Sequence, residues 1–360
     1  MSMQRVIALL GRKDEPTDAV EEYCRYLGVA LAPHNIQWEI HRFPWEKIGW
    51  PEAFEQFKKS ATAWRDHWVL VQYTALAWSA RGFPSKFQNV LRLLKSAGVR
   101  VAIVFHDVEG FPGTRIIDRI RRTVQIRTMR RALSLADSAI FPVATQQLSW
   151  LPPAISKAKF IPVGPNLPIP AVAIPVVPNS VPTIGIFSIT GGEPGSRETN
   201  LIIPAVATAS EKLGTLRLSV FGRHAELRES DLRAGFQKVP VQLSVEGVVD
   251  PDQVVQKLSA CDLLLFVRGG ISSRRSSAIA GIACGLPVVA LAGSETAPPV
   301  TDAGVLLIPH ADPQLIAAAL VRVLSDSALR SELASRSRAA YQQHFSWPAI
   351  AAKFAELLNS

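Results

Sequence analysis

Short apolar runs alternate with segments of helical periodicity along this chain, and that alternation limits the possible folds more than any other feature. In the first part of the sequence the apolar runs lie at residues 4–10, 68–72, 99–105 and 138–143. Strands that alternate with helices usually pair in parallel, with helices covering the sheet. The pattern therefore predicts an α/β fold built on a doubly wound, Rossmann-like parallel sheet.

A proline-rich stretch interrupts the alternation once. Prolines occupy positions 162, 165, 168, 170, 175, 178 and 182, and each removes a backbone donor that a helix would need. The alternation then resumes, with predicted strands at residues 183–188, 216–221, 241–245, 262–267, 286–291 and 305–308. We predict a first domain at residues 1–161, a linker at 162–182 and a second Rossmann-like domain at 183–343. Parallel sheets carry ligand loops at the carboxyl ends of their strands, so two such sheets facing one another predict a ligand cleft.

The composition narrows the class of protein. Cys24, Cys261 and Cys284 are widely separated, which argues against a disulfide framework or a cysteine metal site and favours a reducing cytoplasm. No stretch reaches the ~20 apolar residues of a membrane span, and the first residues become charged too early for a signal peptide. We therefore expect a cytoplasmic globular protein. The formal net charge of +9 suits three anionic partners: nucleic acid, a phosphorylated ligand or an anionic membrane surface.

Much of this charge lies in residues 115–131, which contain seven arginines and one aspartate. Helical periodicity predicts an apolar face of Ile116, Ile120 and Val124. The arginines that flank this face are Arg115, Arg119 and Arg122. A basic amphipathic helix of this kind is typical of contact with a membrane surface, and the alternative is a helix buried on one face and solvated on the other. No nucleic-acid-binding motif accompanies the arginines, so nucleic acid is not expected as a partner.

A loop rich in glycine, serine and arginine precedes a short helix within residues 268–290, and Gly285 fits the C-terminal cap of that helix. The residues at the expected helix start are Ser272, Ser273, Arg274, Arg275, Ser276 and Ser277. Free amides, the positive end of the helix dipole and two guanidinium groups together favour phosphate binding. The alternative is an ordinary strand-to-helix turn with a solvated basic loop.

Four segments occur in an order that resembles the group 1, or RfaB-like, glycosyltransferases of the GT-B fold. Residues 280–289, AGIACGLPVV, are similar to the family's EAMACGLPVV segment, and residues 303–313 are similar to its GLLVPPGDP turn. Residues 247–262 resemble its G.V..EEL...L..AD passage, and residues 345–351 resemble its closing FSW..IA helix. The likeness covers most of residues 183–358. It implies two Rossmann-like domains facing a cleft, with a nucleotide sugar held by the second domain.

The resemblance implies a glycosyltransferase that moves a sugar from a nucleotide-diphosphate donor to a saccharide or lipid-linked acceptor, in the assembly of cell-surface polysaccharide or another glycan. It also implies no bound metal, no cofactor besides the donor substrate, and a helix at residues 344–360 that packs back on the first domain. One departure matters, because Ser272 and Ala280 hold the places of the family's two glutamates. Neither side chain accepts hydrogen bonds as a carboxylate does. The second hypothesis is therefore a non-catalytic binding or scaffold protein that partners an active transferase.

The resemblance also extends to positions outside this segment. Arg197 fits the place of the family's lysine beside the leaving phosphates, and Ile189 takes the place of its arginine; the alternative for Arg197 is an exposed arginine at a helix start. Gly11 and Arg12 end the first strand, where the family has a glycine-rich loop. His106 follows a strand at the place where relatives have a histidine beside the donor sugar. Three roles fit this histidine: a bond to a sugar hydroxyl, a base with a pKa near neutrality, or a structural role. We predict that it contacts the sugar and is not a dedicated base.

Aromatic residues between the first two predicted strands are the last candidates. Trp45 and Trp50 stand next to prolines in a predicted loop, and tryptophan faces suit both sugar rings and membrane interfaces. We predict that they contact the acceptor or a membrane. Trp64 and Trp68 have helical spacing and are predicted to be core residues. The Asp-Pro-Asp sequence at residues 250–252 precedes a predicted helix, where aspartate is a common N-cap, so no metal site is predicted there.

Overall fold

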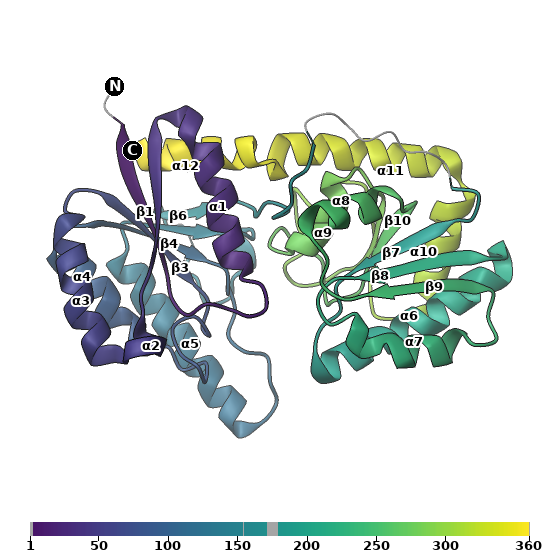
Figure 1. Cartoon of the computed structure of the whole chain (residues 1–360), viewed down its shortest axis with the longest axis horizontal. Helices are drawn as coiled ribbons and strands as arrows, with labels where there is room; N and C mark the ends of the chain where they lie inside the picture. Colours follow the sequence, from purple (N-terminus) through teal and green to yellow (C-terminus); the bar gives the residue numbers. More distant parts are fainter. Residues whose placement is uncertain (1–2, 154, 171–178, 360) are drawn as a thin grey trace. The chain divides into compact units, whose positions relative to one another are not determined.

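The computed structural model describes residues 3–153, 155–170 and 179–359. The chain forms two compact units: unit 1 comprises residues 1–162 and 347–360, and unit 2 comprises residues 163–346. Each unit contains a six-stranded sheet, and the strand pairings are parallel, which confirms the predicted α/β class (Figure 1). Residues 171–178, in the middle of the predicted linker, lie outside the described residues. Within the described ranges, no helix is both long enough and apolar enough to cross a bilayer.

Unit 1 has the strand order β2-β1-β3-β4-β5-β6. The strands are β1 (Gln4–Leu10), β2 (Ile36–Arg42), β3 (Trp68–Tyr73), β4 (Arg100–Phe105), β5 (Ser138–Phe141) and β6 (Ala158–Phe160). The four predicted runs correspond to β1, β3, β4 and β5, while the two edge strands β2 and β6 were not predicted. Because β2 pairs with one side of β1 and β3 with the other, the order of the strands reverses between β1 and β3. Ligands of open α/β sheets bind at such points.

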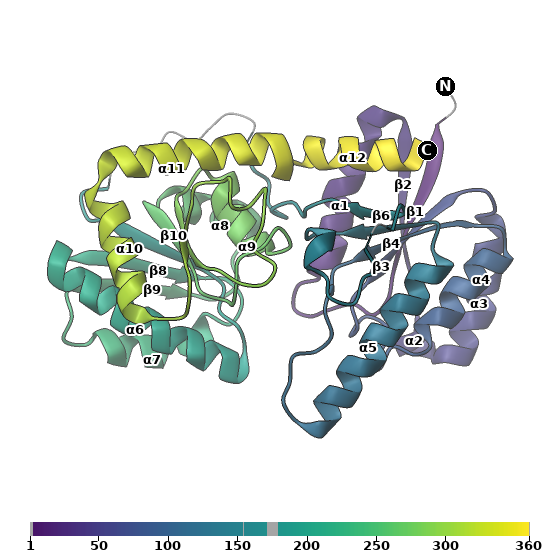
Figure 2. The ribbon, with the colours of Figure 1, turned by 180° about the vertical axis from the view of Figure 1, so that it is seen from behind.

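The helices of unit 1 cover both faces of its sheet (Figures 1 and 2). They are α1 (Ala19–Leu31), α2 (Trp45–Ile48), α3 (Trp50–Ala63), α4 (Phe87–Ser96), α5 (Ile116–Leu135) and α12 (Trp347–Asn359). α1 packs against α12, where the ring of Trp347 stacks on Tyr26 at 5.6 Å between centroids. α3, α4 and α5 pack in sequence on the other face, over a core that includes Phe57, Phe87 and Trp64. Trp64 and Trp68 are buried, as predicted.

Unit 2 has the strand order β12-β11-β10-β7-β8-β9. The strands are β7 (Thr183–Phe187), β8 (Leu216–Phe221), β9 (Val241–Glu246), β10 (Leu263–Phe266), β11 (Val288–Leu291) and β12 (Val305–Ile308), so all six predicted strands are present. The helices are α6 (Gly192–Leu213), α7 (Glu229–Phe236), α8 (Pro251–Ser259), α9 (Ser276–Ala283), α10 (Pro313–Ser325) and α11 (Ser327–Ala340). The chain reverses its direction across the sheet between β7 and β10, which again defines a ligand-binding point.

α9 begins and ends close to where the sequence predicted. Gly285 has a φ of +73°, a left-handed conformation that favours glycine. The amide of Gly285 donates to the carbonyl of Ile282 at 3.0 Å, and the amide of Leu286 donates to the carbonyl of Gly281 at 3.0 Å. This pair of hydrogen bonds is a Schellman motif, which confirms the predicted C-terminal cap.

Candidate functional site

Arginines gather at the carboxyl ends of β7, β8 and β10 in unit 2. Arg268 follows β10, and its Nε lies 3.4 Å from the hydroxyl of Thr190, which belongs to the loop after β7. Its Nη1 lies 3.4 Å from the hydroxyl of Ser277 in the first turn of α9. Arg223 follows β8, and its charge acts on Arg268. Arg275 immediately precedes α9 and is influenced by the charge of Arg268. We call Arg223, Arg268, Arg274 and Arg275 the arginine cluster.

The cluster holds more positive charge than its surroundings neutralise. Burial lowers the pKa of Arg268, and the charge of Arg223 lowers it further, although Glu198 acts in the opposite direction. Burial lowers the pKa of Arg275 to about 10, with further contributions from Arg274 and Arg268. Among the described residues, Arg275 Nε is buried and has no hydrogen-bond partner. Crowded and desolvated cations with an unused donor are the electrostatic signature of an anion site.

The backbone adds to this positive potential. α9 starts at Ser276 beside Arg275, and the N-terminus of a helix offers free amides and the positive end of its dipole. α6 starts at Gly192, next to the loop that carries Thr190. Glu198 faces into this region from α6, where its Oε2 accepts the amide of Thr190 at 3.0 Å. The arrangement suits a phosphate or diphosphate at the carboxyl ends of β7 and β10, where the strand order of the sheet reverses.

The predicted residues of this region occupy different environments. Ser272 and Ser273 are 0% and 3% exposed, so they are part of the packed loop and do not offer their side chains to solvent. Arg274 forms a paired hydrogen bond with Glu295, with distances of 2.6 Å from Nε to Oε2 and 2.9 Å from Nη2 to Oε1. Ser276 and Ser277 are half-buried at the start of α9. Arg275 lies within the arginine cluster, and its binding of phosphate stays a prediction.

Arg197 lies apart from these contacts. It is exposed on α6 and pairs with Glu193 of the same helix, with 3.6 Å between Nη2 and Oε1. Its role at the leaving phosphates stays a prediction. Ile189 is fully buried in the core of unit 2. The guanidinium groups at the strand ends are instead those of Arg223 and Arg268.

Sequence reasoning missed Arg223, Arg268 and Glu295. A usable signal exists for the two arginines, because each follows a predicted strand within two residues, where parallel sheets place ligand-binding side chains. Glu295 follows β11 by four residues in a loop without a motif. Its proximity to Ser272 and Arg274 depends on the neighbouring positions of β10 and β11 in the sheet.

Unit 1 has its own pocket, of about 250 Å³, at the carboxyl ends of β1 and β3. Gly11, Arg12, Asp18, Gln72 and Asp107 are among the residues that line it. A side chain at Gly11 would be impossible without movement, because a Cβ there would lie 2.2 Å from the carbonyl oxygen of Ala77. That carbonyl accepts the amide of Arg12 at 2.8 Å. The close approach of the two loops therefore forms a wall of the pocket, which Gly11 and Arg12 line, and their contact with a ligand stays a prediction.

His106 lies behind this pocket. Its Nε2 lies 2.8 Å from Oε1 of Gln72, and its ring packs edge-on against Tyr23 at 5.1 Å between centroids. Since a carbonyl oxygen accepts hydrogen bonds, Nε2 carries the proton. Burial lowers the pKa of His106 to about 4, although the charge of Asp18 acts to raise it. The lowered pKa argues against a base that titrates near neutrality, and contact with a donor sugar stays a prediction.

Trp45 and Trp50 do not lie in a loop, which corrects the sequence-based prediction. Trp45 begins α2 and Trp50 begins α3, and prolines suit these helix starts because they lack the donor that is unsatisfied there. The two rings stack on one another, with 5.3 Å between centroids. The indole Nε1 of Trp45 donates to the carbonyl of Ala77 at 2.9 Å. Both rings line a shallow cavity of about 340 Å³ with Lys86, so a role with an acceptor stays a prediction.

The apolar face predicted for α5 is not the face that the helix buries. Ile116 and Ile120 are 79% and 50% exposed. The helix instead buries a face that includes Asp118, Gln125 and Met129. Asp118 pairs with Arg121 at 2.7 Å, while Arg115, Arg119 and Arg122 are exposed. α5 is therefore buried on one face and solvated on the other, as the alternative prediction had it, but Ile116 and Ile120 lie on the solvated face. The start of the helix combines exposed apolar and cationic side chains. Contact with a membrane stays a prediction.

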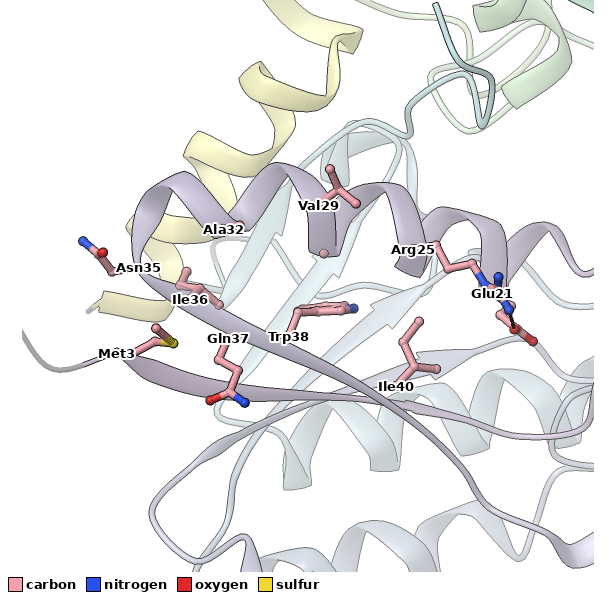
Figure 3. A pocket seen from close by; sticks show the side chains of 11 residues that line it. Met3, Glu21, Arg25, Val29, Ala32, Asn35, Ile36, Gln37, Trp38 and Ile40 are labelled. Carbon is pink, nitrogen blue, oxygen red and sulfur yellow. Dashed lines mark hydrogen bonds and ion pairs between the residues drawn. The ribbon is translucent and has the colours of Figure 1, made fainter. Parts of the chain in front are cut away.

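A further hollow, of about 870 Å³, lies between α1 and the edge strand β2 (Figure 3). Figure 3 shows the side chains of Trp38 and Ile40 on β2, with Arg25 and Glu21 of α1 joined at one end. The predicted site residues of unit 1 lie outside this hollow. The walls of the hollow are mostly apolar, and its charged residues Arg25 and Glu21 pair with each other, so it offers little to an anionic ligand.

Comparisons with known proteins agree with this geometry. Residues 193–326 match the model of the family described as "Glycosyl transferases group 1". The solved structure of HepE from Anabaena, in complex with UDP and glucose, is 15% identical with a TM-score of 0.66 over 99% of each chain. A glycosyltransferase from Rickettsia africae is 12% identical with a TM-score of 0.67, covering 100% of this chain and 98% of that one. WaaG, a glycosyltransferase involved in lipopolysaccharide biosynthesis, is 14% identical with a TM-score of 0.62, covering 99% and 100%.

The structural matches show the fold. The chain has the fold of the GT-B glycosyltransferases, and residues 193–326 of unit 2 match the group 1 glycosyl transferase model. All four residues of the arginine cluster lie within the matched range. A search of curated proteins by sequence finds no significant match.

Proposed function

We propose that this protein is a glycosyltransferase that moves a sugar from a nucleotide-diphosphate donor to a saccharide or lipid-linked acceptor. The observation that carries the proposal is the arginine cluster. It lies at the carboxyl ends of β7 and β10, where the strand order reverses, in the region that matches the group 1 glycosyl transferase model. Departure of a nucleoside diphosphate builds negative charge, and fixed cations in a partly desolvated site stabilise such charge. HepE, which shares the fold, has been solved with UDP-glucose, which supports a nucleotide sugar as the donor class.

Arg268 and Arg275 are the residues we assign to the diphosphate, together with the amides at the start of α9. The pocket bounded by Gly11 and Asp107 in unit 1 is assigned to the acceptor. Its lining combines carboxylates, an amide and cations, which suit a ligand rich in hydroxyl groups. His106 lies behind this pocket and holds the side-chain oxygen of Gln72, and its predicted place beside the donor sugar remains part of the proposal.

A ligand panel tests this function. Purified protein is heated with UDP, GDP, ADP and the corresponding sugars, and at least one should raise the melting temperature. A ligand at about 100 times its Kd should add roughly 2.7 kcal/mol of stability. Transfer or hydrolysis of the stabilising donor should then be measured with Arg268→Met as the negative control. Binding without turnover for any acceptor would favour the non-catalytic scaffold hypothesis, and absence of binding to the whole panel would remove the proposal.

We further propose that the start of α5 contacts an anionic membrane surface, where a lipid-linked acceptor would be found. Ile116, Ile117 and Ile120 are exposed beside Arg115 and Arg119, which joins apolar insertion to charge attraction. Sedimentation with vesicles should depend on anionic lipid and weaken in Ile116→Ser/Ile120→Ser. Leu227→Ser, at a similarly exposed position in unit 2, is the matched control. Equal sedimentation of all three proteins would contradict membrane contact through α5.

A further inference from the structure

A carboxylate reaches the start of α9 from a different loop. Glu295 follows β11, and its side chain is 13% exposed. Its Oε2 accepts the hydroxyl of Ser272 at 3.1 Å and Nε of Arg274 at 2.6 Å, while its Oε1 accepts Nη2 of Arg274 at 2.9 Å. The resemblance to group 1 glycosyltransferases implies a glutamate at position 272, where this chain has serine. A carboxylate is therefore present beside this position, although the residue at position 272 does not supply it.

The backbone fixes this carboxylate firmly. The loops after β10 and β11 approach so closely that a Cβ on Gly270 would lie 2.6 Å from the Cα of Gly293. The amide of Ile271 donates to the carbonyl of Leu291 at 2.8 Å, and the hydroxyl of Thr296 donates to the carbonyl of Ile271 at 2.6 Å. These contacts hold both loops in one register, so Glu295 has little freedom to leave Arg274.

The pairing leaves part of Arg274 available. A guanidinium group has five N–H donors, and Glu295 takes Nε–H and one Nη2–H, so the Nη1 edge remains for a ligand. Burial alone would raise the pKa of Glu295, but the hydrogen bond from Arg274 and the charges of Arg274 and Arg275 outweigh it and lower the pKa. Glu295 is thus a fixed anion at neutral pH that holds one side of Arg274.

We infer that Glu295 is a positioning residue of the donor site, which orients the free edge of Arg274 toward the diphosphate held by Arg275 and Arg268. The inference rests on the proposed function. Two effects of Glu295 on anion binding can be distinguished. If Glu295 only reduced the positive potential of the site, its neutralisation would strengthen anion binding. If Glu295 positions Arg274, neutralisation should weaken anion binding, because the guanidinium loses its anchor.

The test measures binding of inorganic pyrophosphate and of UDP to the full chain by calorimetry, well below the melting temperature. In Glu295→Gln, which keeps the size of the side chain, both ligands should bind roughly 10-fold more weakly, the effect of one lost charge-assisted hydrogen bond. Arg274→Gln should weaken binding to a similar extent. The double variant should bind no more weakly than either single variant, because residues that act as a unit are not additive. Glu229→Gln, which breaks an exposed Glu–Arg pair on α7, is the matched control and should bind as the wild type does.

The binding results distinguish failure of the proposed function from failure of the role of Glu295. Wild-type protein that binds neither pyrophosphate nor any nucleoside diphosphate would overturn the proposed function together with the role of Glu295. Wild-type binding with unchanged or tighter binding by Glu295→Gln would overturn the role of Glu295 alone. Should Glu295→Gln not fold, Glu295→Asp keeps the charge but withdraws it by one methylene. It should show the same weakening, and unweakened binding by Glu295→Asp would refute positioning through Arg274.

Discussion

Replacing Arg275 by methionine should stabilise the ligand-free protein and at the same time remove its response to diphosphate. The guanidinium of Arg275 is partly desolvated, and Arg274 and Arg268 repel it. Its buried Nε has no hydrogen-bond partner among the described residues. Methionine has a comparable length and no charge, so it can occupy the same space without these costs. An arginine kept in such a place stabilises a bound anion at the expense of the free protein.

The lowered pKa sets the size of the effect. The free-energy cost is about 1.36 kcal/mol for each tenfold change in acid strength, and a pKa lowered to about 10 gives an upper bound of about 3 kcal/mol. Partial exposure to solvent reduces this to roughly 1–2 kcal/mol. Because the pKa is lowered in the folded state, the charged form costs stability at every pH below about 10, including neutral pH, and the cost fades only above that value. For domains of this size, the melting temperature of Arg275→Met should rise by roughly 4 °C.

Calorimetric unfolding at neutral pH and low salt measures both parts of the prediction. Wild type and Arg275→Met are compared without ligand and with pyrophosphate, using Arg233→Met as the control. Arg233 pairs with Glu229 on the surface of α7, so its loss should change stability by less than about 0.5 kcal/mol. A lower melting temperature for ligand-free Arg275→Met, or an undiminished rise with pyrophosphate, would refute the view that Arg275 is an uncompensated cation of an anion site.

Two further predictions concern unit 1. Burial lowers the pKa of His106 to about 4, so His106 is neutral in the folded protein at neutral pH. The unfolded chain binds a proton at this residue near pH ~6.5, so the free energy of unfolding should fall as the pH drops from about 6.5 to about 4. The fall should be steeper in the wild type than in His106→Gln. Urea denaturation across this range measures the slope, and identical slopes would contradict the assignment. Gly11→Ala should lose about 1–3 kcal/mol of stability, because the added Cβ would lie 2.2 Å from the Ala77 carbonyl oxygen. An unchanged urea midpoint would show that the two loops can separate without cost.

The central strands were predictable because they are buried on both faces. β3, β4 and β10 are nearly continuous apolar runs, as parallel strands covered by helices must be. The edge strand β2 is different, since Gln37 and Glu39 interrupt its apolar residues and no run stands out. β6 has only three residues, and its pairing with β5 is a tertiary contact that a local pattern does not record.

Prolines misled the prediction for Trp45 and Trp50. A proline ends a helix when it falls inside one, but it is well suited to the first turn, where its missing amide is not needed. Pro44 is the residue before α2, and Pro51 is in the first turn of α3. The same residue type therefore marks a helix start here and a non-helical linker at residues 162–182, and only the apolar periodicity that follows distinguishes the two cases.

The order of strands explains which site residues could be found from local sequence. Arg274 and Arg275 belong to one loop and one helix start, so their neighbourhood is contained within a few residues. Arg268 meets Thr190 only because β10 lies beside β7, and Arg274 meets Glu295 only because β10 lies beside β11. Local sequence around Ser272 contains no carboxylate, and the contact of Glu295 with Ser272 and Arg274 becomes visible only when the sheet order is known. In a parallel sheet the carboxyl ends of neighbouring strands lie at the same edge. The loop after either strand can therefore place a side chain at the same site.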